Sequence, residues 1–122
     1  MKLPEGPVRT YVETKIRTAP PGELADELCR LCIQTIDELL LRIHQPEVTS
    51  RGQLMERAVS ILLHLHEARP PGSLGPKLQM LYAYCADCIV RSGLSQDCSH
   101  LSQARAILMR LRQAFVMSLP KA

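Results

Sequence analysis

Two Cys-x-x-Cys pairs are the residues of this chain with the clearest potential for chemistry. They are Cys29 with Cys32 and Cys85 with Cys88, and two such pairs can supply the four thiolates of a tetrahedral zinc site. Residues 33–84 separate the pairs, far more than the ~15–20 residues of a zinc ribbon. Both pairs also fall inside helical patterns, where cysteine behaves as a small apolar residue. We therefore expect the five cysteines to be reduced residues of a core or groove; a metal- or thiol-dependent regulator is the alternative.

The remaining polar residues form no catalytic arrangement. His64 and His66 are two residues apart, so on a helix they point in different directions and cannot share a metal ion. The serines and threonines have no glycine-rich or elbow context, and no phosphate-binding loop is present. A charged helix face accounts for the carboxylates of the first helical segment, which are Asp26, Glu27, Asp37 and Glu38. We expect no enzyme, no catalytic residue, no bound metal and no cofactor.

Length and composition indicate one small helical domain. The chain has 122 residues, of which 46% are hydrophobic and only 3% are aromatic, so its core must consist mainly of aliphatic side chains and cysteine. No apolar run reaches the ~18 residues needed to cross a bilayer, and the first residues do not resemble a signal peptide. An odd number of cysteines argues against a disulfide framework. These features predict a cytoplasmic protein that does not insert into membranes.

Charge is unevenly distributed along the chain. Residues 20–45 carry five acidic and two basic side chains, whereas residues 95–122 carry four basic and one acidic. The arginines at 105, 110 and 112 could contact phosphates, but the pI of about 8.7 is low for a nucleic-acid-binding domain. No aromatic residues alternate with these arginines for base stacking. We expect attraction between the first and last helices and no nucleic-acid partner.

Four segments show apolar residues at the spacing of one helical face. Segments of about twenty residues joined by short connections predict an all-α protein, an antiparallel four-helix bundle. An extended N-terminal arm, residues 1–19, precedes the bundle of residues 20–118. The expected helices are 20–44, 50–69, 73–93 and 98–118.

Local signals suggest where these helices begin and end. Thr49 or Ser50 can cap the second helix, and Asp97 or Ser99 can cap the fourth. Gly93 is expected to end the third helix in a left-handed conformation.

Two short signatures, about sixty residues apart, resemble a known family. The first has Tyr11, Ile16 and then Thr18-Ala19-Pro20-Pro21-Gly22-Glu23-Leu24; the second is Leu81-Tyr82-Ala83-Tyr84. Their order and placement resemble the flagellin-specific export chaperones, the FliS family, from about Tyr11 to Phe115. The residues that match the family's motifs within the helices are Leu24, Leu28, Leu81, Tyr82 and Tyr84.

The resemblance implies a function. In this family a helical bundle holds the C-terminal tail of flagellin, prevents premature filament assembly in the cytoplasm and presents the subunit for export. The resemblance thus implies a flagellar secretion chaperone whose partners are the flagellin tail and the flagellar export apparatus. A chaperone for a different exported subunit is the alternative within this class.

The chain also departs from the family pattern at two places. Where the family usually has Tyr-Asp-Gly after Leu28, this chain has Cys29-Arg30-Leu31, and a usual arginine pair after Tyr84 is replaced by Asp87-Cys88. An exchange of charges between the two helices would explain both departures. We expect Arg30 and Asp87 to form an ion pair between the first and third helices.

A client tail would bind in apolar strips between neighbouring helices. The candidates are apolar residues that lie off the main stripe of each helix, and methionines among them would let the groove adapt. We expect Tyr11 and Ile16 of the N-terminal arm to cover a groove when the client is absent. The groove candidates are Ile33, Leu41, Met55, Leu62, Leu63, Ile89 and Met109.

Overall fold

The computed structural model describes residues 21–44, 48–68, 72–95 and 97–118. These residues form the helices α2 (Pro21–Arg42), α3 (Val48–Glu67), α4 (Leu74–Ser95) and α5 (Cys98–Ser118). The part of the chain that is described contains no strand. Each helix begins and ends within two residues of the bounds expected from the apolar spacing. The expected N-terminal arm lies outside the described residues.

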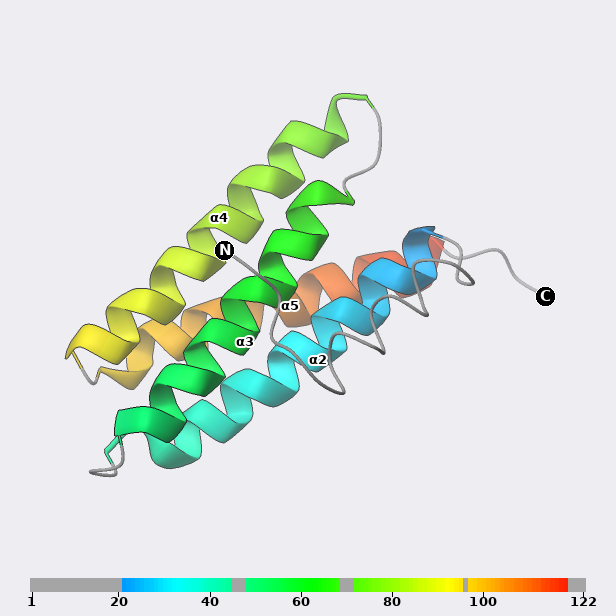
Figure 1. Cartoon of the computed structure of the whole chain (residues 1–122). Coiled ribbons are helices and arrows are strands. Elements are labelled where there is room, and N and C mark those ends of the chain that lie inside the picture. The colour runs from blue at the N-terminus through cyan, green and yellow to red at the C-terminus, as the bar shows by residue number, and fades with distance from the viewer. Residues whose placement is uncertain (1–20, 45–47, 69–71, 96, 119–122) are drawn as a thin grey trace.

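The helices form a closed ring of neighbours (Figure 1). α2 packs against α3, α3 against α4, α4 against α5, and α5 against α2, whereas α2 and α4 face each other across the core without close backbone contact. Consecutive helices are joined by short connections and run in opposite directions. The predicted antiparallel four-helix bundle is therefore confirmed.

The core consists almost entirely of aliphatic side chains and cysteines. Leu28, Ile36, Ile61 and Leu108 are at most 1% exposed, and each such side chain contributes roughly 1.5–3 kcal/mol when fully buried. Tyr82 of α4 is the aromatic side chain buried among them. Because nearly all the other core side chains are aliphatic or cysteine, the helices can pack closely along their lengths.

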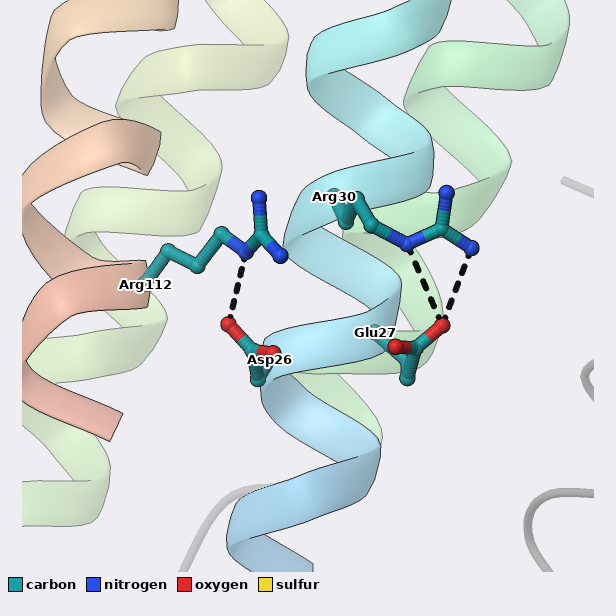
Figure 2. Close-up of polar contacts among 4 residues, drawn as sticks. All are labelled: Asp26, Glu27, Arg30 and Arg112. Atoms are coloured by element: carbon teal, nitrogen blue, oxygen red, sulfur yellow. Dashed lines mark hydrogen bonds and ion pairs between the residues drawn. The ribbon is translucent and has the colours of Figure 1, made fainter. Parts of the chain in front are cut away.

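Two ion pairs join the outer edges of α2 and α5. Arg105 Nε lies 2.7 Å from Asp37 Oδ1, and Arg112 Nε lies 2.8 Å from Asp26 Oδ1 (Figure 2). Asp26 is only 9% exposed, so its carboxylate needs the charged hydrogen bond that Arg112 donates. The expected attraction between the acidic first helix and the basic last helix is confirmed.

The expected ion pair between Arg30 and Asp87 is wrong. Arg30 Nη2 lies 3.0 Å from Glu27 Oε2 on its own helix (Figure 2), and Asp87 pairs with Arg91 one turn further along α4. The physical reason is the order of the helices in the ring. α2 and α4 are diagonal, so side chains on their outer faces point away from each other.

The signals for helix ends were correct in only one of three places. The Asp97 carboxylate accepts a hydrogen bond of 2.9 Å from the Ser99 amide, which confirms Asp97 as the cap of α5. α3 already begins at Val48, so Thr49 and Ser50 lie inside its first turn. Gly93 does not end α4, which continues to Ser95.

Gly93 has a packing role instead. A Cβ atom at this position would overlap the Sδ and Cε atoms of Met55 on α3. The absent side chain therefore makes room for Met55 where α3 and α4 meet. Gly72, which precedes α4, has a positive φ of 92°, a backbone conformation that favours glycine.

Two glycine substitutions test this packing. Gly52→Ala, at an open position of α3 where the new Cβ would have no atom within 4 Å apart from its own stretch of helix backbone, should stabilise the protein by about 0.5–1 kcal/mol because alanine favours helix. Gly93→Ala should gain less, or lose stability, because Met55 must move. Urea unfolding followed by circular dichroism measures both changes. An equal gain at the two positions would contradict the contact between Met55 and Gly93.

Candidate functional site: an apolar groove between α3 and α4

A hollow of about 200 Å³ lies between α3 and α4. Its lining is apolar except for one imidazole and one phenol, and comes only from these two helices. Typical small-molecule sites have volumes of ~300–1,000 Å³, so this hollow suits one or two apolar side chains of a protein partner better than a cofactor. We call it the α3–α4 groove; its lining residues are Val59, Leu62, Leu63, His66, Tyr82, Ala83 and Ala86.

The hollow exists because α4 contributes small side chains where α3 contributes large ones. Ala83 and Ala86, three residues apart, lie on the side of α4 that faces α3. Together with Leu62 and Leu63 of α3 they line the hollow. Ala83 is exposed and Ala86 is half-buried, so both methyl groups are accessible to a partner.

Tyr82 and Leu62 form the deepest part of the groove, each with 2% of its surface exposed. Burial, followed by the nearby thiols of Cys29 and Cys85, raises the pKa of Tyr82 well above its usual range. The phenol therefore stays neutral at physiological pH. Its ring belongs both to the core and to the lining of the groove.

One end of the groove is polar. His66 Nδ1 of α3 and Gln79 Nε2 of α4 lie 3.5 Å apart, a hydrogen bond at the long limit. The pair connects the two helices near the loop between them. A bound segment would therefore meet apolar side chains along the groove and hydrogen-bonding groups at this end.

The groove brings together only some of the residues expected from sequence. Leu62 and Leu63 line it. Met55 and Met109 are half-buried and pack against the core, on α3 and α5. Leu41 is 80% exposed, but it lies on α2, away from the groove.

The interpretation of Ile33 and Ile89 as residues off the buried stripe is wrong. They are 6% and 0% exposed and belong to the core. Each helix packs against two neighbours, so its buried face is wider than a single stripe, and flanking apolar residues are covered as well. Tyr11 and Ile16 of the expected arm lie outside the described residues.

The family-motif residues divide between core and surface. Leu24, Leu28 and Tyr82 are buried, whereas Leu81 is 37% and Tyr84 is 48% exposed. The Tyr84 hydroxyl donates a 3.3 Å hydrogen bond to Gln103 Oε1 of α5. The Leu-Tyr-x-Tyr string thus places one tyrosine under the α3–α4 groove and the other at the junction with α5.

Sequence reasoning missed Val59, His66, Ala83 and Ala86. A pair of alanines three residues apart on a helix could have indicated a shallow place, since small residues leave space beside a neighbouring helix. That signal becomes specific only when the helix facing the alanines is known.

The cysteine pairs do not form a joint metal site. Cys29, Cys32, Cys85 and Cys88 are buried, and Cys98 is exposed at the start of α5. Cys32 Sγ donates to the Ala58 carbonyl of α3 at 3.8 Å, and Cys85 Sγ donates to the Ala104 carbonyl of α5 at 3.9 Å. Among the described residues, no group of three or more histidine, cysteine, aspartate or glutamate side chains is placed to hold a metal ion. The expectation of core or groove cysteines does not hold for Cys98.

The fold is a four-helix bundle with an apolar groove along the seam between α3 and α4. In the described helices, no segment is both long and apolar enough to span a membrane. Comparison with curated proteins found no match. The family model described as "Flagellar protein FliS" matches residues 5–122. The chain belongs to this family, the flagellin-specific export chaperones.

Thiol reactivity provides a test of the cysteine positions. Burial raises the pKa values of Cys29 and Cys85 to about 12, and that of Cys32 is also raised by burial, so little reactive thiolate exists near neutral pH. We expect one thiol per chain, Cys98, to react rapidly with a chromogenic disulfide. The other four should react only after denaturation. Cys98→Ser should remove the rapid phase; a second rapid thiol in that variant would contradict the buried positions.

Proposed function

We propose that this protein is a flagellar secretion chaperone that binds the disordered C-terminal tail of flagellin in the cytoplasm. While the chaperone covers the tail, flagellin would be prevented from polymerising prematurely and would stay ready for export. Membership of the FliS family supports the class of function. The α3–α4 groove supports the mode of binding, and it is the observation on which the proposal depends.

The groove suits an amphipathic segment that folds as it binds. Apolar side chains spaced three or four residues apart on such a segment could insert beside Ala83 and Ala86. Each fully buried large side chain contributes roughly 1.5–3 kcal/mol, whereas a micromolar complex requires about 8 kcal/mol. Ordering of the tail adds a further cost. We therefore expect several anchoring side chains, some of them beyond the groove itself.

The polar end of the groove would set the register of the tail. His66 and Gln79 offer hydrogen-bonding groups next to an otherwise apolar lining. A tail seated one residue out of register would place an apolar side chain against these polar groups, where it gains no hydrogen bond and takes water away from them. The apolar lining supplies affinity, and this pair supplies orientation.

The flagellar export apparatus is the second partner in this proposal. A chaperone that only sequestered its client would not deliver it, so the bundle must also present the complex for export. Family membership supports this role, and no particular surface of the described residues is assigned to it.

Calorimetry with flagellin tests the proposal directly. Full-length flagellin should bind the protein in the micromolar range or tighter, and flagellin without its C-terminal tail should not bind detectably, because the tail carries the anchoring side chains. Equal affinity for both forms, or no binding of either, would contradict it. A different exported subunit that binds through its own disordered terminus would support the alternative client.

A matched pair of leucine substitutions tests the groove. Leu63→Glu places a charge at the half-buried edge of the groove, where a bound tail would remove it from water, so affinity should fall at least ~10-fold. Leu41→Glu introduces the same charge on α2 at a side chain that is 80% exposed and should leave affinity within about twofold.

Thermal unfolding of both variants controls for loss of the fold. Equal losses of affinity in the two variants would place the client elsewhere on the bundle. No loss in Leu63→Glu would exclude the α3–α4 groove as the main binding site.

A further inference from the structure

Two titratable side chains line the α3–α4 groove among the described residues, His66 and Tyr82. Tyr82 stays a neutral phenol at physiological pH, because burial raises its pKa well above its usual range. Histidine, in contrast, ordinarily changes its charge between about pH 5 and 8. The charge of the groove lining therefore depends on whether His66 carries a proton.

His66 lies at the polar end of the groove and has apolar neighbours along it. It is half-buried, and Leu62 and Leu63, one turn earlier on α3, line the hollow with it. On α4, Gln79 Nε2 lies 3.5 Å from His66 Nδ1. In this arrangement the amide donates and Nδ1 accepts, so the imidazole is neutral and carries its proton on Nε2. Protonation of Nδ1 would set two donors against each other and remove this hydrogen bond.

The described groove lining holds no carboxylate that could compensate for a positive charge on His66. On α3, His64 and Glu67 lie within two residues of it but do not line the groove. On α4, Lys77 lies two residues from Gln79, is exposed, and as a cation would not stabilise an imidazolium. α2 also packs against α3 but contributes no residue to the lining. In the free protein an imidazolium is therefore stabilised by water and, at the surface, by Glu67.

We infer that a client tail binds in the α3–α4 groove only when His66 is neutral, so that the affinity for flagellin falls as His66 gains a proton. The inference rests on the proposed function, because it concerns a client seated in this groove. Apolar side chains of the tail would exclude water from around the ring, and a buried charge without a partner is strongly unfavourable. A neutral imidazole, in contrast, can keep its hydrogen bond to Gln79 in the complex.

The direction of the pH dependence follows from the number of protons bound. A complex that holds neutral His66 binds fewer protons than the free protein at acidic pH, so lowering the pH favours the free protein. When a ligand binds only one state of a protein, the apparent Kd is the intrinsic Kd divided by the fraction in that state. For a histidine with ordinary titration, the apparent Kd should rise about 5–10-fold between about pH 7.5 and about pH 5.5.

Calorimetry at these two pH values, with a flagellin C-terminal tail peptide that contains no histidine, tests the inference. The unaltered protein should show the expected loss of affinity at the lower pH. His66→Gln keeps a hydrogen-bonding side chain that cannot gain a proton, so its Kd should differ by less than about twofold between the two pH values, whatever its value at neutral pH. His44→Gln, at an exposed position just after α2, is the matched control and should retain the full loss.

Proton release provides a readout that a merely structural role of His66 would not change. Near about pH 6.5, binding of the peptide should release roughly half a proton per complex, which appears as different binding enthalpies in two buffers of unequal ionisation enthalpy. The release should disappear in His66→Gln and persist in His44→Gln. NMR of the His66 ring in the unaltered protein should show that the peptide keeps it neutral at a pH where it is protonated in the free protein. Thermal unfolding at both pH values checks that each protein is folded.

Two results would overturn the inference while leaving the proposed chaperone function intact. One is a Kd that is the same, or lower, at the acidic pH. The other is a loss of affinity in His66→Gln as large as in the unaltered protein, which would assign the pH dependence to another group. No binding of the peptide at either pH would contradict the proposed function, and the inference with it.

Discussion

Each helix of the bundle buries a broad row of aliphatic and cysteine side chains in one shared core, and this packing determines the positions of all other features. The core side chains are small enough to let four helices close into a ring without large aromatic spacers. Four of the five cysteines serve this purpose as compact apolar residues, and the thiols of Cys32, Cys85 and Cys88 donate to neighbouring backbone carbonyls or side chains. Chemistry at these thiols would require opening the core.

The seams between neighbouring helices differ in their polar and apolar composition. In the described residues, the α2–α5 seam is closed on its outer side by Arg105 with Asp37 and by Arg112 with Asp26. The α3–α4 seam has an apolar groove instead, with the polar contact between His66 and Gln79 at one end. An apolar client gains little on the first seam, where it would have to displace charged hydrogen bonds. At the α3–α4 seam an apolar client would instead cover apolar surface, whose contact with water is unfavourable.

Much of the fold could be predicted from the sequence, because apolar spacing reports directly on the buried face of each helix. The prediction that Gly93 ends a helix was wrong because glycine can either end a helix or make room for a neighbouring side chain. Only the position of Met55 distinguishes the two cases. The Arg30–Asp87 pair failed for a similar reason: two helices of a bundle can be adjacent or diagonal, and periodicity within each helix does not contain that information.

The groove was harder to predict than the fold. Leu62 and Leu63 were expected from their apolar character, but the hollow depends equally on Ala83 and Ala86, which attract no attention as single residues. Ile33 and Ile89 were expected in a groove, off the buried stripe, because one stripe per helix underestimates burial in a ring. Which residues remain accessible is decided by the relative rotation of neighbouring helices, a property of the whole bundle.

The most direct test of the central claim is methyl NMR of the protein bound to a peptide of the flagellin C-terminal tail. The account predicts intermolecular NOEs from the methyl groups of Val59, Leu63, Ala83 and Ala86, which line the groove. The Leu41 methyls on α2 should keep the chemical shifts of the free protein. NOEs from the peptide to the α2–α5 seam, with the groove methyls unperturbed, would contradict the claim that the α3–α4 groove holds the client.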